Sequence, residues 1–310
     1  MTAIQIESLT KVYGAVRALD GLDLTVEPGV VFGFLGPNGA GKTTAIRILT
    51  GLARPTAGRA RVAGIDLAAD GRALSRTIGH LPEEPAFYPW MTPLEFLDYL
   101  GRLYGIATTE RKARIRELLE QVGLYETRKR RIGGFSRGMR QRLGLGAALI
   151  HRPSVLFLDE PVSALDPAGR KDVLELIDSL RGRCTVFMST HILADVGRIC
   201  DVVGIINHGK LVVQSPREAL LAQYAAPVFE LEAIESESLR RWADSLRQAD
   251  WVTAVSLEGG MARVTVKDVA FARRELLASA VQAKLALTRY AEVKPALEDV
   301  FLQLVKEGVS

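Results

Sequence analysis

A glycine-rich segment of the sequence ends in an adjacent lysine and threonine. Gly36-Pro-Asn-Gly-Ala-Gly-Lys-Thr43 fits the pattern G-x-x-x-x-G-K-[ST], between an apolar run typical of a strand and a helical stretch. Glycines let backbone N–H groups curl around phosphate oxygens, and a helix N-terminus adds the positive end of its dipole. Lys42 then reaches the β- and γ-phosphates, and the Thr43 hydroxyl can ligate Mg²⁺. The predicted nucleotide-binding residues are Gly36, Pro37, Asn38, Gly39, Ala40, Gly41, Lys42, Thr43 and Thr44.

Two adjacent carboxylates, Asp159 and Glu160, follow an unbroken apolar run at 155–158, which is typical of a buried parallel strand. Successive residues at a strand end point in different directions, so the two carboxylates can do different work. Because a hard cation takes oxygen ligands, we assign Asp159 to Mg²⁺, usually through water. Glu160 is then the candidate general base for an attacking water. Capping of the following helix is the structural alternative.

Strand-like and helix-like segments alternate through the first 223 residues. Short β-branched runs predict strands at 4–9, 22–26, 30–35, 155–158, 185–189 and 202–206. Amphipathic spacing predicts helices at 42–50, 93–104, 110–122 and 167–180. This alternation is typical of an α/β domain around a mostly parallel sheet. We place that domain at residues 1–224, with a helical subdomain at about 85–150.

Residues 225–310 have a different pattern. The predicted order is strand 228–234, helix 238–248, a hairpin around Gly259 and Gly260, helix 269–280, strand 285–290 and a final helix at 295–305. The order β-α-β-β-α-β is ferredoxin-like. We therefore expect a small α+β domain that supports dimerisation or regulates turnover, rather than one that binds nucleotide.

The composition is that of a globular protein, because 48% of the 310 residues are hydrophobic and 25% are charged. No run approaches the ~20 apolar residues of a membrane-spanning helix, and the first ten residues lack a secretory signal pattern. Two cysteines, Cys184 and Cys200, cannot form a disulfide scaffold and indicate a reducing compartment. We expect a cytoplasmic protein.

The net charge of +4 hides a basic segment at 111–142, which holds eleven Lys and Arg residues against three Glu. Such a segment can face nucleic acid, anionic lipid or nucleotide phosphate, or it can be a solvated helical face. A nucleic-acid surface would need interleaved aromatics for stacking, and the segment has only Tyr125 and Phe135. We expect no nucleic-acid partner.

A third motif makes the sequence resemble the ATPase subunits of ABC transporters. Phe135-Ser-Arg-Gly-Met139 precedes the carboxylate motif and is similar to the family's Leu-Ser-Gly-Gly-Gln signature. Ser136 and Gly138 match, whereas Arg137 replaces a glycine, and Phe135 and Met139 replace the Leu and Gln. The variant Ser-Arg-Gly-Met occurs in the family's antibiotic-exporter branch. The resemblance implies that this segment opens a helix whose N-terminus contacts the γ-phosphate bound on a partner subunit. Ser136 is also an ordinary helix N-cap residue.

Further matches follow in order along the chain. Asp166, in Ser163-Ala-Leu-Asp166, resembles the loop that links two ATP sites across the dimer, and Tyr13 resembles the aromatic that stacks on adenine. His191 resembles the switch histidine, which contacts the γ-phosphate and orients Glu160 and water.

One departure from the family concerns the metal. Where the family usually has a glutamine that contacts Mg²⁺ and the membrane partner, Ile78-Gly-His-Leu-Pro82 is followed by Glu83. The resemblance implies ATP and Mg²⁺ as cofactors, with Thr43, Glu83 and Asp159 at the metal.

The resemblance implies a P-loop NTPase of the ABC cassette type that hydrolyses ATP and powers a separate integral-membrane permease from the inner face of the membrane. It implies a head-to-tail homodimer, or a heterodimer with a second ATPase subunit. Pro295-Ala-Leu-Glu-Asp-Val-Phe301 is similar to the end of the small domain of daunorubicin-type exporters, which favours export of a drug, lipid or ion.

Two alternatives stay open, a soluble ABC protein that acts on ribosomes or nucleic acid and the ATPase subunit of an importer. The single P-loop and the lack of room for a long coiled coil between the nucleotide motifs argue against the first. The α/β alternation after residue 227 argues against a sugar importer, whose relatives continue with short strands.

The segment Pro85-Ala-Phe-Tyr-Pro-Trp-Met91 carries three aromatics and no charge. Concentrated aromatics are typical of an interface, although a small satellite core is the structural alternative. In ABC ATPases the matching region receives a short cytoplasmic helix of the permease. We therefore expect Tyr88 and Trp90 to face the membrane partner.

Overall fold

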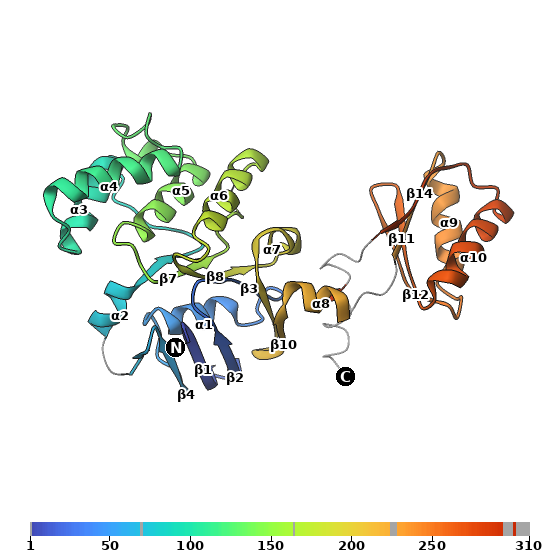
Figure 1. The fold of residues 1–310 in the computed structure, drawn as a ribbon, viewed down its shortest axis with the longest axis horizontal. Coiled ribbons are helices and arrows are strands. Elements are labelled where there is room, and N and C mark those ends of the chain that lie inside the picture. The colour runs from blue at the N-terminus through green and yellow to red at the C-terminus, as the bar shows by residue number, and fades with distance from the viewer. Residues whose placement is uncertain (1, 69–70, 164, 224–227, 294–299, 302–310) are drawn as a thin grey trace. The chain divides into compact units, whose positions relative to one another are not determined.

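The chain forms two compact units, and their boundary in the sequence lies between Arg217 and Glu218. The computed structural model describes residues 2–68, 71–163, 165–223, 228–293 and 300–301. In these ranges no helix is both long and apolar enough to cross a lipid bilayer. The two units are described separately below (Figure 1).

A six-stranded sheet forms the centre of the first unit. Its spatial order is β10 (Lys210–Pro216), β9 (Val202–Asn207), β3 (Val31–Leu35), β8 (Thr185–Thr190), β7 (Val155–Asp159) and β6 (Ile78–Leu81). All neighbours are parallel except β10 and β9. The predicted mostly parallel sheet is confirmed, and the predicted strands at 30–35, 155–158, 185–189 and 202–206 all lie in it.

Stacked phenylalanines fix the middle strands of this sheet. Phe187 of β8 lies with its ring centre 5.2 Å from those of Phe32 and Phe34 of β3 and 5.6 Å from that of Phe157 of β7. All four rings are fully buried. Because close packing resists displacement, the carboxyl ends of these three strands are held in a fixed relation.

A second, antiparallel sheet was not anticipated from the sequence. It has the order β2 (Val16–Val26), β1 (Ile4–Tyr13), β4 (Ala57–Val62) and β5 (Ile65–Asp66). Helix α1 (Lys42–Leu49) contacts β2 and β4 of this sheet and β7 of the central one, so it is packed between the two sheets (Figure 1).

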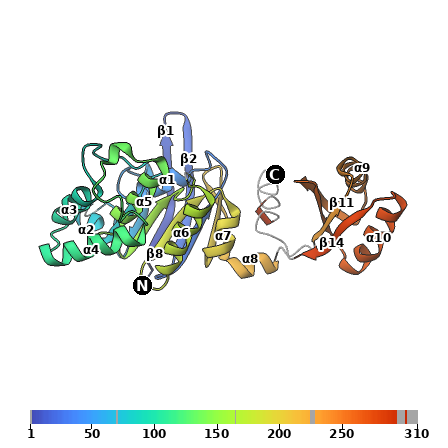
Figure 2. The same cartoon turned by 90° about the horizontal axis from the view of Figure 1, so that it is seen from above.

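Helices cluster on one side of the first unit, where we predicted a helical subdomain (Figure 2). They are α3 (Pro93–Leu103), α4 (Thr108–Gln121) and α5 (Arg137–Ala148), with a 3₁₀ turn at Ile132–Gly134. A capping box starts α3, because Thr92 accepts from the N–H of Glu95 and the Glu95 carboxylate accepts from the N–H of Thr92. The other helices of this unit are α2 (Gly71–Thr77), α6 (Pro167–Ser179) and α7 (Leu193–Ile199). Helix α8 (Arg217–Gln223) begins at the boundary and belongs to the second unit from Glu218 on.

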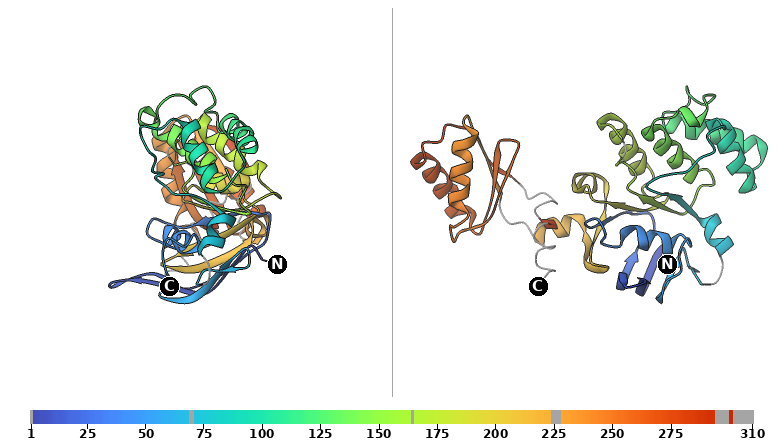
Figure 3. Two further views of the ribbon diagram at one scale, coloured as in Figure 1. Left: turned by 90° about the vertical axis from the view of Figure 1, so that its left-hand side faces the viewer. Right: turned by 180° about the vertical axis from the view of Figure 1, so that it is seen from behind.

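The second unit follows the predicted β-α-β-β-α-β order. Its elements are β11 (Val228–Ala233), α9 (Ser236–Leu246), β12 (Val252–Glu258), β13 (Met261–Val266), α10 (Val269–Gln282) and β14 (Leu287–Val293). The sheet order is β12-β13-β11-β14 and every pairing is antiparallel, which confirms the ferredoxin-like prediction. Both helices cover one face of the sheet (Figure 3) and bury Phe229, Trp242 and Leu276 against it. The final helix predicted at 295–305 lies outside the described residues, apart from 300–301.

Candidate active site

The residues predicted to bind and hydrolyse a nucleotide lie where neighbouring parallel strands end. β3 leads into the glycine-rich loop, β7 ends at Asp159, β8 is followed by His191, and β6 is followed by Pro82 and Glu83. The strands are adjacent in the order β3-β8-β7-β6, so their carboxyl ends share one edge of the sheet. This edge is where ligands bind in open α/β sheets.

The loop between β3 and α1 is tightly packed and requires glycine at two positions. At Gly41, where φ is +109°, a Cβ would lie 2.5 Å from the carbonyl oxygen of Ala18. At Gly36 a Cβ would lie 2.4 Å from the carbonyl oxygen of Ile206. Because Gly41 is also the N-cap of α1, no side chain covers the positive end of that helix. The N-terminus of α1 is therefore available to an anion.

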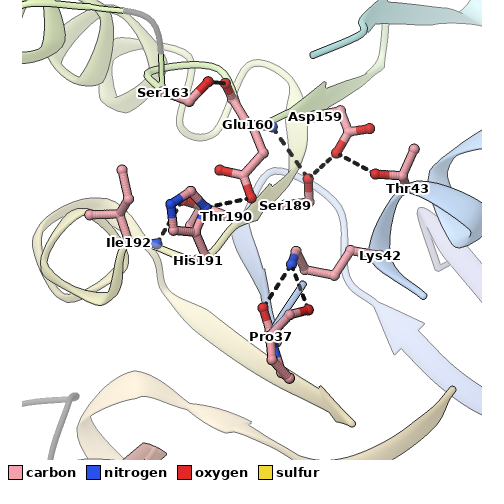
Figure 4. Close-up of polar contacts among 11 residues, drawn as sticks. Pro37, Lys42, Thr43, Asp159, Glu160, Ser163, Ser189, Thr190, His191 and Ile192 are labelled. Atoms are coloured by element: carbon pink, nitrogen blue, oxygen red, sulfur yellow. Dashed lines mark hydrogen bonds and ion pairs between the residues drawn. The ribbon is translucent and has the colours of Figure 1, made fainter. Parts of the chain in front are cut away.

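Lys42 is buried at the base of this loop, with 7% of its surface exposed. Its Nζ donates hydrogen bonds to the carbonyl oxygens of Gly36 at 2.7 Å and Pro37 at 3.2 Å (Figure 4). Burial lowers the pKa of Lys42 from its ordinary value, and the charges of Glu160, Asp159 and Glu83 oppose that shift. Phosphate oxygens would replace the two carbonyl acceptors with stronger, charged ones.

Asp159 is a buried carboxylate that accepts from two hydroxyl groups. Its Oδ1 lies 2.5 Å from Ser189 Oγ and 3.3 Å from Thr43 Oγ1 (Figure 4). The strand end at Asp159 and the helix start at Thr43 thus bring together the two oxygen donors predicted to hold the metal.

This donor set fits a hydrated Mg²⁺. Among the residues that the structure describes, no cluster of three His, Cys, Asp or Glu side chains forms a metal cage by itself. Mg²⁺ in proteins usually keeps several waters and is bound by one or two protein oxygens together with substrate phosphates. A hydroxyl and a carboxylate beside a phosphate-binding loop meet that requirement. Glu83 lines a cavity together with Thr43, but among the described residues it makes no hydrogen bond to Asp159 or Thr43.

Glu160 adopts a strained backbone conformation, with φ at +49°. Its N–H donates to the carbonyl oxygen of Ser189 at 3.1 Å, which ties the turn after β7 to the end of β8. Its Oε1 lies 3.0 Å from Nδ1 of His191, which is half exposed (Figure 4). Its Oε2 is buried and has no hydrogen-bond partner within the described part of the chain. That oxygen is free to accept a proton from a water molecule beside it.

These residues surround one cavity of about 410 Å³. Its lining residues are Ala18, Asn38, Gly39, Gly41, Lys42, Thr43, Thr44, Glu83, Glu160 and His191. The cavity therefore unites most of the predicted nucleotide loop with the predicted base, the predicted histidine and Glu83. Gly36, Pro37 and Ala40 belong to the same loop but do not line it.

Five other predicted residues do not line this cavity: Asp159, Ser136, Gly138, Asp166 and Tyr13. Asp159 is joined to the cavity through its contact with Thr43. Ser136 caps α5 by accepting from the N–H of Met139 at 3.2 Å, and Gly138 lies in the first turn of that helix. Asp166 caps α6 by accepting from the N–H of Gly169. Tyr13 ends β1, with Lys11 Nζ 4.7 Å from its ring centre. Within this chain, Ser136 and Asp166 make only the contacts of ordinary N-caps among the hydrogen bonds that the structure describes.

The sequence analysis missed two contributors to the site. Ser189 donates to the Asp159 carboxylate, and its carbonyl oxygen accepts from the N–H of Glu160. Its signals in the sequence were its place at the end of a predicted strand and its position two residues before His191. Ala18 belongs to β2 of the unanticipated antiparallel sheet, so nothing in the local sequence linked it to the loop.

Comparisons with known proteins agree with this geometry. Residues 19–163 match the family model "ABC transporter", and residues 216–305 match the model "ATP-binding protein DrrA1-3-like, C-terminal domain". The chain is 40% identical over 302 residues to an uncharacterized ABC transporter ATP-binding protein of Bacillus subtilis (strain 168), an alignment that covers 97% of this chain and 99% of the relative.

Two other similar proteins are informative. The chain is 36% identical over 304 residues to a daunorubicin resistance ATP-binding protein of Streptomyces coeruleorubidus, covering 98% of this chain and 96% of the relative. Among solved structures, the ATP-binding subunit of an ABC transporter superposes with a TM-score of 0.67 at 28% identity, covering 72% of this chain and 93% of that one.

The geometry predicts that Glu160→Gln slows ATP hydrolysis by a factor of roughly 10²–10⁴, because an amide cannot accept the proton of the attacking water. ATP affinity should remain within a few-fold of wild type, since Lys42 and the glycine loop are unchanged. Steady-state phosphate release and fluorescent ATP binding measure the two quantities. Glu175→Gln, on the exposed surface of α6, is the matched control and should hydrolyse normally. Wild-type turnover by Glu160→Gln would show that Glu160 is not the base.

Proposed function

Because this chain belongs to the family of ABC transporter ATP-binding proteins, which are ATPases, we propose that it powers export through a separate membrane permease. The main support for export is a similarity to proteins whose names record daunorubicin resistance. This similarity extends along nearly the whole chain and includes the C-terminal unit. A transporter that confers resistance lowers the concentration of the toxin inside the cell when it exports the toxin, which favours export over import. The transported compound is not encoded in this subunit.

The residues around the cavity have different roles in ATP hydrolysis. The glycine loop and Lys42 bind the β- and γ-phosphates, and Thr43 and Asp159 hold Mg²⁺, which supplies positive charge that stabilises the phosphate oxygens. Glu160 accepts a proton from the attacking water at its free Oε2. His191 holds Oε1 of the same carboxylate and so fixes its orientation.

We infer that two copies complete each ATP site. Ser136, Gly138 and Asp166 resemble residues that act across a subunit interface, and none of them lines the cavity of its own chain. The first turn of α5, with Ser136 at its N-cap, provides N–H groups and a positive dipole end for a γ-phosphate on a second chain. Such a head-to-tail arrangement fits a homodimer and a heterodimer equally well.

The aromatic segment after Glu83 supports a docking role for the helical side of the first unit. Phe87 packs edge-on against Phe96 of α3, with ring centres 5.1 Å apart, so it belongs to the local core. Tyr88 and Trp90 instead leave 42% and 64% of their surfaces exposed and contact one another. Exposed, paired aromatics are typical anchors of a protein interface. We propose that they receive a cytoplasmic helix of the permease and hold the subunit on the inner face of the membrane.

We expect Trp90→Ala to weaken binding of the permease by roughly 30-fold, since loss of a central interface aromatic costs about 2 kcal/mol or more. The basal ATPase rate of the isolated subunit should be nearly unchanged, because Trp90 lies outside the cavity. Co-purification from membranes and phosphate release are the measurements. Leu52→Ala, which removes an equally exposed apolar side chain elsewhere, is the control. Normal permease binding by both variants would place the docking surface elsewhere.

The C-terminal unit is proposed to support dimerisation or regulate turnover, and the boundary near residue 224 remains our prediction. Its sheet has β12 and β14 as edge strands. The face of β11 opposite the helices carries Glu230, paired with Arg289 at 2.8 Å, so that face is charged. An edge strand can pair with a second copy through its backbone.

Removal of residues 224–310 should therefore leave ATP affinity intact and weaken dimerisation. The first unit keeps its own core, whose buried residues come from both of its sheets, so it should still fold. The full-length and the shortened chain would both carry Glu160→Gln and would both be mixed with ATP. Light scattering would then compare the fraction of dimer in the two samples. Equal dimer populations would refute the dimerisation role, and a shortened chain that no longer binds ATP would refute the boundary.

A further inference from the structure

Glu83 lines a second cavity besides the one that holds the glycine loop. This second cavity, of about 240 Å³, is lined by Glu83, Glu84 and Pro85 after β6 and by Arg137, Arg140 and Gln141 of α5. Glu83 thus lies between the candidate ATP cavity and the first turns of α5.

The first turns of α5 carry charges of the wrong sign for a helix N-terminus. Arg137 is the first residue of the helix, Arg140 is the fourth, and the first turn contains no acidic residue. The positive end of a helix favours anions and is destabilised by cations. Arginines at these positions therefore favour negative partners from elsewhere in the chain, although Arg140 Nη1 already donates to the carbonyl oxygen of Phe135 at 3.2 Å.

Those partners come from the loop after β6. Arg137 Nη2 lies 3.7 Å from Glu84 Oε1, and Glu83 lines the same cavity as both arginines. One exposed ion pair contributes little, but the two carboxylates also line a cavity with residues of the first turns of α5, where the positive end of the helix favours anions. The first turn of α5 contains no acidic residue. Glu83 and Glu84, which belong to the loop after β6, therefore provide the negative charge there.

Gln141 adds an unused donor to this cavity. Its side chain is 2% exposed, and within the described residues its Nε2 has no hydrogen-bond partner. A buried amide of this kind favours an acceptor that approaches it. The carboxylates of the adjacent loop are acceptors that line the same cavity.

Glu83 also contributes its charge to the candidate ATP cavity. Glu83 and Lys42 line the same ATP cavity, so the carboxylate charge lies near the phosphate-binding lysine. The position of the Glu83 charge therefore affects the field at the ATP cavity. The contacts that hold the loop of Glu83 against α5 therefore also influence the electrostatic field at the ATP cavity.

We propose that Glu83 and Arg137, the two departures from the ABC sequence pattern that introduce a charge, compensate each other. Arg137 is a positioning residue: with Arg140 it neutralises the carboxylates of Glu83 and Glu84 and holds their loop against α5. The glutamate can then replace a neutral amide beside bound phosphates without a net penalty. The inference rests on the proposed function for the role of the ATP cavity, whereas the pairing itself exists without nucleotide.

A double-mutant cycle tests this compensation in the full chain. Arg137→Gln should weaken ATP binding in the presence of Mg²⁺ by about two- to five-fold, the size that exposed ion pairs give, because Glu83 is left uncompensated. In the E83Q background the same substitution should change affinity by less than a factor of two. Arg137→Lys, which keeps the charge, should bind like wild type. Arg116→Gln, which breaks an equally exposed pair with Glu120, is the charge-matched control.

A nucleotide-free measurement makes the test independent of the ATP site. The melting temperatures of the wild type, E83Q, R137Q and the double variant should be non-additive at low salt, with the coupling reduced at 1 M NaCl. Additive changes, or equal weakening of ATP binding by R137Q with and without E83Q, would overturn the proposal, as would Arg137→Lys behaving like Arg137→Gln. If Lys42→Ala kept its ATP affinity, the proposed ATP site would be wrong, while the nucleotide-free cycle would still decide the pairing.

Discussion

Three charged side chains buried at one edge of a parallel sheet are the constraint on which the site depends. Lys42, Asp159 and Glu160 are each less than a tenth exposed, and unpaired charges at such depth are costly. The structure gives each one a partner: backbone carbonyls for the lysine, two hydroxyls for the aspartate and an imidazole for the glutamate. The stacked phenylalanines beneath hold the strand ends close enough for these pairings.

A bound nucleotide and its cation would replace some of these partners with stronger ones. Phosphate oxygens are better acceptors for Lys42 than the carbonyl of Pro37, and a cation is a better partner for Asp159 than a hydroxyl. Because the protein side chains are already dehydrated and aligned, little reorganisation is needed on binding. The Oε2 of Glu160, which has no hydrogen-bond partner among the described residues, is a position where water can bind. We view the site as prepared for phosphate chemistry by the burial of its own charges.

The sequence predicted those features that local motifs encode. The glycine loop, Asp159 and Glu160 are short patterns at strand ends, and they converge because parallel strands share one carboxyl edge. The antiparallel sheet was missed because it depends on a long-range pairing of Ile4 with Val62, and because Ala57–Val62 contains few β-branched residues. The pairing of Arg137 with the Glu84 loop was likewise invisible, since the two segments are far apart in sequence and meet only through the fold.

The most direct test of this account is a crystal structure of the Glu160→Gln variant with ATP and Mg²⁺. We predict the γ-phosphate within hydrogen-bond distance of Lys42 Nζ, the metal between Thr43 and Asp159, and a water between the γ-phosphate and the side chain at position 160. The opposite face of that phosphate should meet Ser136 of a second chain. A nucleotide bound with its γ-phosphate away from Lys42, or with position 160 turned away from it, would contradict the central claim.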